Sequence, residues 1–180
     1  NALDHPEEAV KYLEKVLVIR FNLLGPTHPE TGLAHNNLGI TYIRLGKDQE
    51  ALEHFHQALE IFNNSLGKNH SSSGAVLQNI AHLYVEQNKL KEAEENYKQG
   101  LEIMKANLGS DHPDLGSGYD NLATVYMLKE DYAKCVELSL KAEEILLKHF
   151  DETHPRMGYV YENLFYAYGK QENHEKAKIY

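Results

Sequence analysis

The chain has 180 residues, of which 42% are hydrophobic and 25% are charged, which is ample for one domain with a continuous core. The net charge of −9 and the lack of a Lys/Arg cluster exclude a general role in binding nucleic acid or anionic membranes. No apolar run approaches the length of a membrane span, and we expect no signal peptide. The single cysteine excludes an intrachain disulfide framework and indicates a reducing, cytoplasmic compartment.

The dominant feature of the sequence is a skeleton of residues that recurs every 42 positions. It first appears as the stretch from His35 to Tyr42, followed by Ala51 and Phe55, and it returns around Gln78, Asp120 and Glu162. A fixed period of this size predicts a solenoid, in which each unit buries its apolar face against its neighbours. Cys135 fills a slot that alanine occupies in the other units. We therefore interpret it as a small buried packing residue and not as a nucleophile.

Each unit is expected to be a pair of helices, and the whole chain, residues 1–180, is expected to be one array. The periodicity places a half unit at residues 5–25, full units at about 28–67, 70–109 and 112–151, and a truncated unit at 154–180. Both ends fall inside a unit and lack the polar face that usually caps a solenoid, so we expect a piece of a longer protein.

Short connectors join one unit to the next. In the first, from Leu24 to Pro29, Gly25 suits the left-handed end of a helix and Pro29 suits the first turn of the next one. A histidine recurs at the same place in every connector, and this recurrence predicts a structural role. These histidines are His28, His70, His112 and His154.

Inside each unit, a polar turn and a small residue are expected to shape the helix pair. Gly46 and Asn88 tolerate the positive φ that such turns need, whereas Glu130 and Glu172 at the same position tolerate it less well. Small residues at positions 39, 81 and 123 allow the two helices to approach closely. Because Phe165 fills that slot in the last unit, we expect altered packing there.

The pattern Gly/Ala–Tyr–Gly–Ala–Phe/Tyr–Ala at this spacing resembles the tetratricopeptide repeat. The 42-residue period, the Leu-Gly-x-x-His-Pro connector and the Asn-Asn-Leu-Gly stretch are most similar to the kinesin-light-chain-like subgroup. The resemblance covers essentially the whole chain. It implies an all-α, right-handed α-solenoid of tandem helix-turn-helix units, whose first helices line a concave, peptide-binding groove.

One asparagine recurs in all four units, and the residue before it varies. We interpret the recurrent residues, Asn37, Asn79, Asn121 and Asn163, as hydrogen-bonded ties between adjacent helices. By resemblance, the preceding position faces the groove, where an asparagine in the kinesin light chains contacts the backbone of the bound peptide. Asn36 keeps that residue, whereas Gln78, Asp120 and Glu162 replace it.

Helical spacing extends the expected groove from this variable position along the same faces. The residues expected to line the groove are Leu33, Asn36, Ile40, Arg44, Gln78, His82, Glu86, Asp120, Thr124, Tyr159, Glu162 and Tyr166. Ala75, Ser117, Leu128 and Lys170 lie on these faces as well. Taken one at a time, each has an equally good interpretation as an ordinary solvated position. Together they describe an acidic middle and an aromatic end, which fit a basic partner segment with an apolar anchor.

Two binding modes of similar proteins do not suit these residues. Chaperone-tail-binding tetratricopeptide domains resemble one another in a Lys/Asn/Lys/Arg clamp for a terminal carboxylate, but the slots for the clamp asparagine hold Ile40, His82, Thr124 and Tyr166. Acidic cargo peptides, which the kinesin light chains prefer, would be repelled by Glu86, Asp120 and Glu162.

Nothing in the sequence favours catalysis. His82 and Glu86 are four apart and form at most one edge of a zinc site, with Asp120 as a conceivable third ligand, whereas structural zinc sites have closed Cys/His sets. We therefore expect no enzyme activity, metal or cofactor, and a non-catalytic interaction or scaffold domain. Two alternatives stay open: an assembly module that stacks through its ends, and a regulatory arm of a larger enzyme or motor-associated protein.

Overall fold

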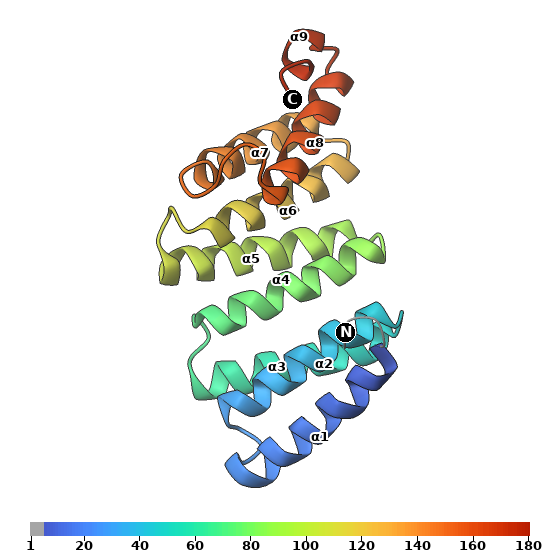
Figure 1. Cartoon of the computed structure of the whole chain (residues 1–180), viewed down its shortest axis with the longest axis vertical. Coiled ribbons are helices and arrows are strands. Elements are labelled where there is room, and N and C mark those ends of the chain that lie inside the picture. The colour runs from blue at the N-terminus through green and yellow to red at the C-terminus, as the bar shows by residue number, and fades with distance from the viewer. Residues whose placement is uncertain (1–5) are drawn as a thin grey trace.

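The computed structural model describes residues 6–180 of the chain and is helical throughout that range (Figure 1). His5, the first residue of the expected half unit, lies outside the described residues. The helices are α1 (Pro6–Leu24), α2 (Pro29–Arg44), α3 (Asp48–Ser65), α4 (Ser71–Glu86), α5 (Leu90–Leu108), α6 (Pro113–Leu128), α7 (Tyr132–Leu146), α8 (Pro155–Lys170) and α9 (His174–Ala177).

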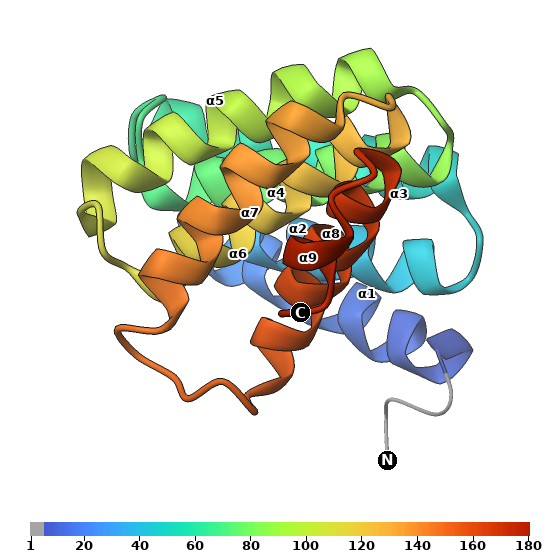
Figure 2. The same ribbon diagram turned by 90° about the horizontal axis from the view of Figure 1, so that it is seen from above.

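The helices stack in chain order along the long axis, with α1 and α9 at opposite ends (Figure 1). Figure 2 looks along that axis. The closest packing joins helices two by two, α2 with α3, α4 with α5 and α6 with α7, and each pair then packs on the next. This is the expected all-α repeat array. Between residues 6 and 180, no helix combines the length and apolarity that a membrane crossing requires.

Each first helix of a unit begins at a histidine of a connector. The Nδ1 atoms of His28, His70, His112 and His154 accept a hydrogen bond from the backbone N–H two residues later, at 3.2 Å in every case. A side-chain acceptor at this position satisfies one of the N–H groups that the first helical turn leaves unpaired. The structural role predicted for these residues is confirmed, and it is that of an N-cap.

The turn inside each unit requires a left-handed residue. The φ angles are 67° at Gly46, 56° at Asn88, 61° at Glu130 and 58° at Glu172. Glycine lacks a Cβ, and asparagine adopts this conformation more readily than glutamate does, so the last two turns are more strained than the first two.

Close approach of paired helices depends on small residues on the first helix. A Cβ added at Gly39 would lie 2.6 Å from a ring carbon of Phe55, so the phenyl ring of α3 occupies the space that a side chain on α2 would fill. Ala81 and Ala123 are fully buried at the equivalent positions, whereas Phe165 is 58% exposed on α8. The packing of the last unit is therefore altered, as expected.

Cys135 is fully buried, and burial raises the pKa of its thiol to about 11.

Candidate functional site

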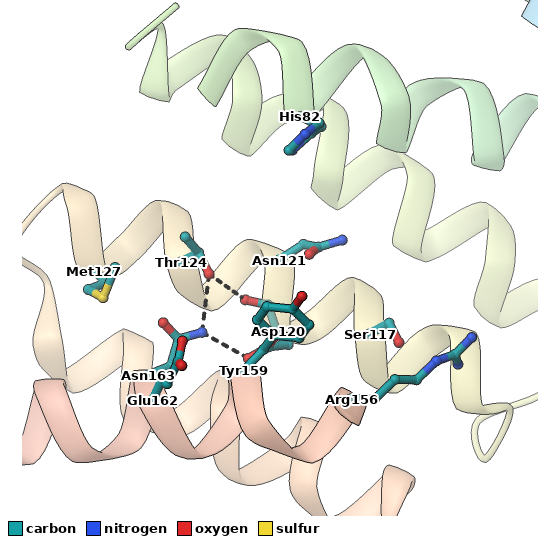
Figure 3. A pocket seen from close by; sticks show the side chains of 10 residues that line it. All are labelled: His82, Ser117, Asp120, Asn121, Thr124, Met127, Arg156, Tyr159, Glu162 and Asn163. Carbon is teal, nitrogen blue, oxygen red and sulfur yellow. Dashed lines mark hydrogen bonds between the residues drawn. The ribbon is translucent and has the colours of Figure 1, made fainter. Parts of the chain in front are cut away.

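Two adjoining hollows run between the first helices in the second half of the array. The first hollow encloses about 510 Å³ and is shown in Figure 3. Its lining residues are His82, Ser117, Asp120, Asn121, Thr124, Met127, Arg156, Tyr159, Glu162 and Asn163. The second hollow encloses about 550 Å³ and is lined by Met127, Leu128, Glu130, Tyr132, Glu162, Asn163 and Tyr166. Because Met127, Glu162 and Asn163 line both, the two hollows form one continuous depression over α6 and α8.

The structure brings together only part of the expected groove. His82, Thr124, Tyr159 and Glu162 meet in the first hollow, and Tyr166 lines the second. The expected groove residues on α2 line neither hollow, and two of those on α4 do not either. On α2 they are Leu33, Asn36, Ile40 and Arg44, and on α4 they are Gln78 and Glu86.

Asp120 is not the exposed acid that we expect from the sequence. Its side chain is 7% exposed, and its Oδ1 accepts a hydrogen bond of 2.8 Å from Nδ2 of Asn163 on α8 (Figure 3). Asn163 Nδ2 also lies 3.1 Å from Oγ1 of Thr124. Neighbouring residues of a helix point about 100° apart, so that Asp120 turns into the α6–α8 junction while Asn121 turns outward and is exposed.

The environment of Asp120 controls its charge. Burial raises the pKa of the carboxyl to about 6, against the opposing effect of the hydrogen bond from Asn163, and Glu162 nearby raises it further. A carboxyl with this pKa is still mostly ionised at neutral pH, but it is buried, so the negative charge exposed in the first hollow comes from Glu162. Arg156 lines the same hollow, so the charge of this hollow is mixed and not purely acidic as expected for the middle of the groove.

The recurrent asparagines tie neighbouring units at two junctions. Asn79 donates from Nδ2 to Oδ1 of Asn36 at 3.0 Å, just as Asn163 donates to Asp120. The structural role predicted for Asn79 and Asn163 is confirmed. In both ties, the acceptor belongs to the previous unit and stands at the variable position directly before the recurrent asparagine of that unit. The sequence analysis predicts that this position faces a ligand.

The junction between α4 and α6 lacks this tie. The longer side chain of Gln78 reaches Sδ of Met104 at 3.2 Å, and its amide packs so close to Gly118 that a Cβ there would lie 2.8 Å from Nε2. Asn121 makes no side-chain hydrogen bond to any residue between 6 and 180, and it lines the first hollow instead. The structural interpretation of Asn121 is therefore wrong.

Several lining residues are missing from the expected set: Asn121, Met127, Glu130, Tyr132, Arg156 and Asn163. Arg156 comes directly after the last connector, at a position that holds Glu30, Ser72 and Asp114 in the other units. Its Nη1 lies 3.2 Å from Oδ1 of Asp114. A residue that varies between units is free to specialise, and an interpretation that assigns the connectors to structure alone overlooks this variation.

The second hollow combines acidic and aromatic side chains. Glu130 and Glu162 are its charged lining residues, and the rings of Tyr132 and Tyr166 lie 6.4 Å apart at an interplanar angle of 59°. The Nζ atom of Lys170 lies 5.3 Å from the centre of the Tyr166 ring, within the range of a cation–π contact. The acidic and aromatic character expected of the groove therefore gathers here.

Neither hollow provides a set of metal ligands. His82 Nε2 lies 3.6 Å from Glu86 Oε1, but no cluster of three or more His, Cys, Asp or Glu side chains suited to a metal occurs within residues 6–180. Asp120, the conceivable third ligand, is buried against Asn163 instead.

Comparison with known families agrees with the repeat architecture. The tetratricopeptide repeat family matches residues 1–63 and 34–106, which together span more than half of the chain. This chain belongs to the tetratricopeptide repeat family. No curated protein matches it.

Solved structures extend the likeness of this tetratricopeptide domain to nearly its whole length. Two structures of a putative kinesin light chain from Podospora anserina, with nearly identical TPR-like repeats, are 28% and 27% identical, with TM-scores of 0.79 and 0.78. Each alignment covers 97% of this chain, and 82% and 83% of the respective neighbour. BtubC (BKLC) from P. vanneervenii is 20% identical over 97% of this chain and 69% of its own, with a TM-score of 0.86. This last similarity concerns the fold alone.

Proposed function

We propose that this tetratricopeptide domain is a non-catalytic scaffold that holds an extended segment of a partner protein across the two hollows. The observation that carries the proposal is their continuity: both lie on the first helices and share Met127, Glu162 and Asn163. Tetratricopeptide repeats present the inner surface of the array to partners, and a depression along it suits a chain segment better than a compact small molecule.

The first hollow suits the backbone of such a segment. Asn121 presents an exposed amide that makes no side-chain hydrogen bond to any residue from 6 to 180. An amide carries both donors and an acceptor, so it can pair with the N–H and C=O of one residue of an extended segment. In this arrangement Asn121 takes the backbone-contacting role that the sequence analysis assigns to the position of Asn36.

The second hollow supplies selectivity for side chains. Glu130 and Glu162 attract a Lys or Arg of the segment, while Tyr132 and Tyr166 form a surface for an apolar or aromatic neighbour. Exposed ion pairs contribute only about 0–1 kcal/mol each, whereas a few well-buried contacts carry most of the affinity of an interface. The apolar anchor therefore supplies affinity, and the acids select a basic segment over an acidic one.

The test is fluorescence-anisotropy binding with an array of extended peptides, each carrying a central Lys or Arg at varied distances from a Leu, Phe or Tyr. Tyr166→Ala should weaken binding of the selected peptide about ten-fold, because one lost buried contact is worth roughly 1.4 kcal/mol. Glu162→Gln should weaken it two- to five-fold, roughly the worth of one exposed pair, and reduce its salt dependence.

The matched control is Glu102→Gln, the same substitution at an exposed site on the second helix α5. It should leave binding unchanged. Equal effects of the two Glu→Gln variants, or selection of acidic peptides by the unmodified chain, contradict the assignment to this depression.

A further inference from the structure

A third, smaller hollow lies where α1, the connector after it, α2 and α3 meet. It encloses about 190 Å³, and its lining includes Phe21, His35, Gln57, Glu60, Ile61 and Asn64. None of its lining residues belongs to the two hollows over α6 and α8. Gln57, Glu60 and Asn64 are exposed on α3, and their side chains make no hydrogen bond or ion pair with another residue between 6 and 180. Their polar atoms are therefore available to a ligand.

The openness of this hollow follows from its own residues. Phe21 is the lining residue on α1, and the equivalent residues of the second helices α5 and α7 are Lys105 and Leu147. Both are exposed, although a first helix precedes α5 and α7 in their own units. A first helix thus does not cover this position, and the hollow belongs to the regular surface of the array.

The third unit fills the equivalent place with its own side chains. Two repeats further along, Lys141 stands where α3 has Gln57, and Tyr119 stands where α2 has His35. Nζ of Lys141 lies 4.3 Å from the centre of the Tyr119 ring, within the range of a cation–π contact. The aromatic ring on the first helix therefore receives an ammonium group from the second helix.

A second lysine of the third unit pairs with an acid. Lys148 stands where α3 has Asn64, and Glu144 stands where α3 has Glu60. Nζ of Lys148 lies 3.7 Å from Oε1 of Glu144 and 2.9 Å from Oδ1 of Asp111. The first unit keeps the acid and an aromatic ring, but shorter neutral amides replace both lysines. The place of the cation is thus left open.

His35 supplies an uncharged ring to this place. Its Nδ1 lies 2.9 Å from Nδ1 of His54, so one imidazole donates to the other. Burial and then the neighbouring His54 lower the pKa of His35 to about 4, and the ring is therefore neutral near pH 7 and does not repel a cation. In the tautomer whose Nδ1 donates to His54, Nε2 keeps a lone pair that accepts a hydrogen bond. No other unit has a histidine at either position.

We propose that this hollow binds the side chain of a lysine that belongs to a partner protein. An ammonium group has three N–H donors, and the carboxylate of Glu60 and the amide oxygens of Gln57 and Asn64 are the acceptors on α3. The ring of His35 lies beside the ammonium group, and the alkyl stem packs on Phe21. The hollow holds one slim side chain, so it anchors a partner at a surface separate from the depression over α6 and α8.

The probe that tests the site is n-butylammonium chloride, which reproduces the end of a lysine side chain. Titrated into the full 180-residue chain at neutral pH, it should cause saturable shifts in the amide NMR signals of Gln57 and Asn64 and in the ring signals of His35. n-Butanol, which has the same alkyl chain without the charge, should cause none. The planar head of n-butylguanidinium is wider and should bind more weakly. Tighter binding of the guanidinium would indicate arginine and overturn the assignment to lysine.

Substitutions make the test specific to this hollow. Glu60→Gln should weaken binding about three- to five-fold, roughly the worth of one exposed ion pair. Its matched control is Glu102→Gln, the same change at the equivalent exposed position of the second unit, where Leu77 replaces the ring, and it should leave binding unchanged. Gln57→Lys combined with Asn64→Lys gives the first unit the lysines of the third. This double variant should abolish binding, because its own ammonium groups fill the hollow.

Binding that survives in the double variant overturns the proposal, as does a titration that does not saturate. Equal effects of the two Glu→Gln variants also overturn it. The substituted side chains are all exposed, and the amide spectrum of each variant shows directly whether its fold is kept. The signal of Glu130 reports on the second hollow. Shifts at Glu130 without shifts at Asn64 would reject this site and leave the proposed peptide-binding depression standing.

Discussion

The junctions between units differ in how they use the same pair of positions. At the first and last junctions, Asn79 and Asn163 donate to Asn36 and Asp120. At the middle junction Gln78 turns away to Met104, and Asn121 lines the first hollow. A residue that recurs in every unit therefore has a structural role in some units and remains available for binding in another, depending on its neighbour across the junction.

The two tied junctions differ from each other in charge. The acceptor is a neutral amide at Asn36 and a buried carboxyl at Asp120, whose pKa burial raises to about 6. A buried carboxylate needs its partner far more than a buried amide does, because an unpaired charge is costly away from water. The last junction is thus the one most sensitive to loss of its donor.

The largest effect should come from removing that donor. Asn163→Ala leaves the carboxylate of Asp120 buried without its bond and should lower the free energy of unfolding by about 3–4 kcal/mol at neutral pH. Asn121→Ala removes an exposed amide and should change it by less than about 0.5 kcal/mol. Urea unfolding of both variants measures the difference. Similar midpoints would show that the recurrent asparagines are equivalent after all, as the sequence pattern suggests.

Asp120→Asn should make the last junction resemble the first and stabilise the protein at neutral pH. The unmodified carboxyl has a raised pKa, so its proton is bound more tightly in the folded chain than in the unfolded one. Protonated Asp120 carries no penalty below pH about 4, and stability falls as the pH rises from about 4 to 6. A shift of roughly two pKa units corresponds to a loss of about 2–3 kcal/mol in the free energy of unfolding.

The measurement is the difference in unfolding free energy between Asp120→Asn and the unmodified chain at several pH values. Subtraction removes the titration of the other carboxyls. The difference should be small near pH 4 and should level off above pH about 6. A difference that stays constant across this range would mean that the carboxyl is not buried in its charged form.

The smallest expected effect comes from supplying the missing tie. Gln78→Asn shortens the side chain so that it no longer reaches Met104 and can accept from Asn121. One additional hydrogen bond should raise the free energy of unfolding by about 0.5–1 kcal/mol. The same variant should weaken peptide binding, since Asn121 is then engaged. Calorimetry measures the stability of the variant, and fluorescence anisotropy measures its affinity for the peptide. Greater stability with unchanged affinity would mean that Asn121 does not contact the peptide.

The 42-residue repeat predicts the helix pairs and their connectors well, because apolar spacing and turn chemistry are local properties. The candidate site is predicted less well. The resemblance predicts that position 120 faces the groove, but whether a side chain turns toward a ligand or into the junction depends on the residue 43 positions later that meets it. Gln78 is longer than Asn36 by one methylene, and its amide reaches Met104 instead of the next unit.

Arg156 and Glu130 show a second limit of the pattern. Both lie in segments that the repeat explains as connector or turn, and this explanation conceals that they also line the hollows. The left-handed φ of 61° at Glu130 is a conformation that glycine adopts at lower cost, as it does at Gly46. Glu130 therefore has two roles, since it forms a turn and lines a hollow, and the periodicity of the sequence reveals only the first.

The histidine N-caps make four helices begin with the same contact. Each imidazole accepts a backbone N–H through Nδ1, so that atom is engaged and only the Nε2 edge of the ring is left for another partner. The starts of α2, α4, α6 and α8 are therefore fixed at equivalent points, and because neighbouring units support one another, this regularity adds along the array.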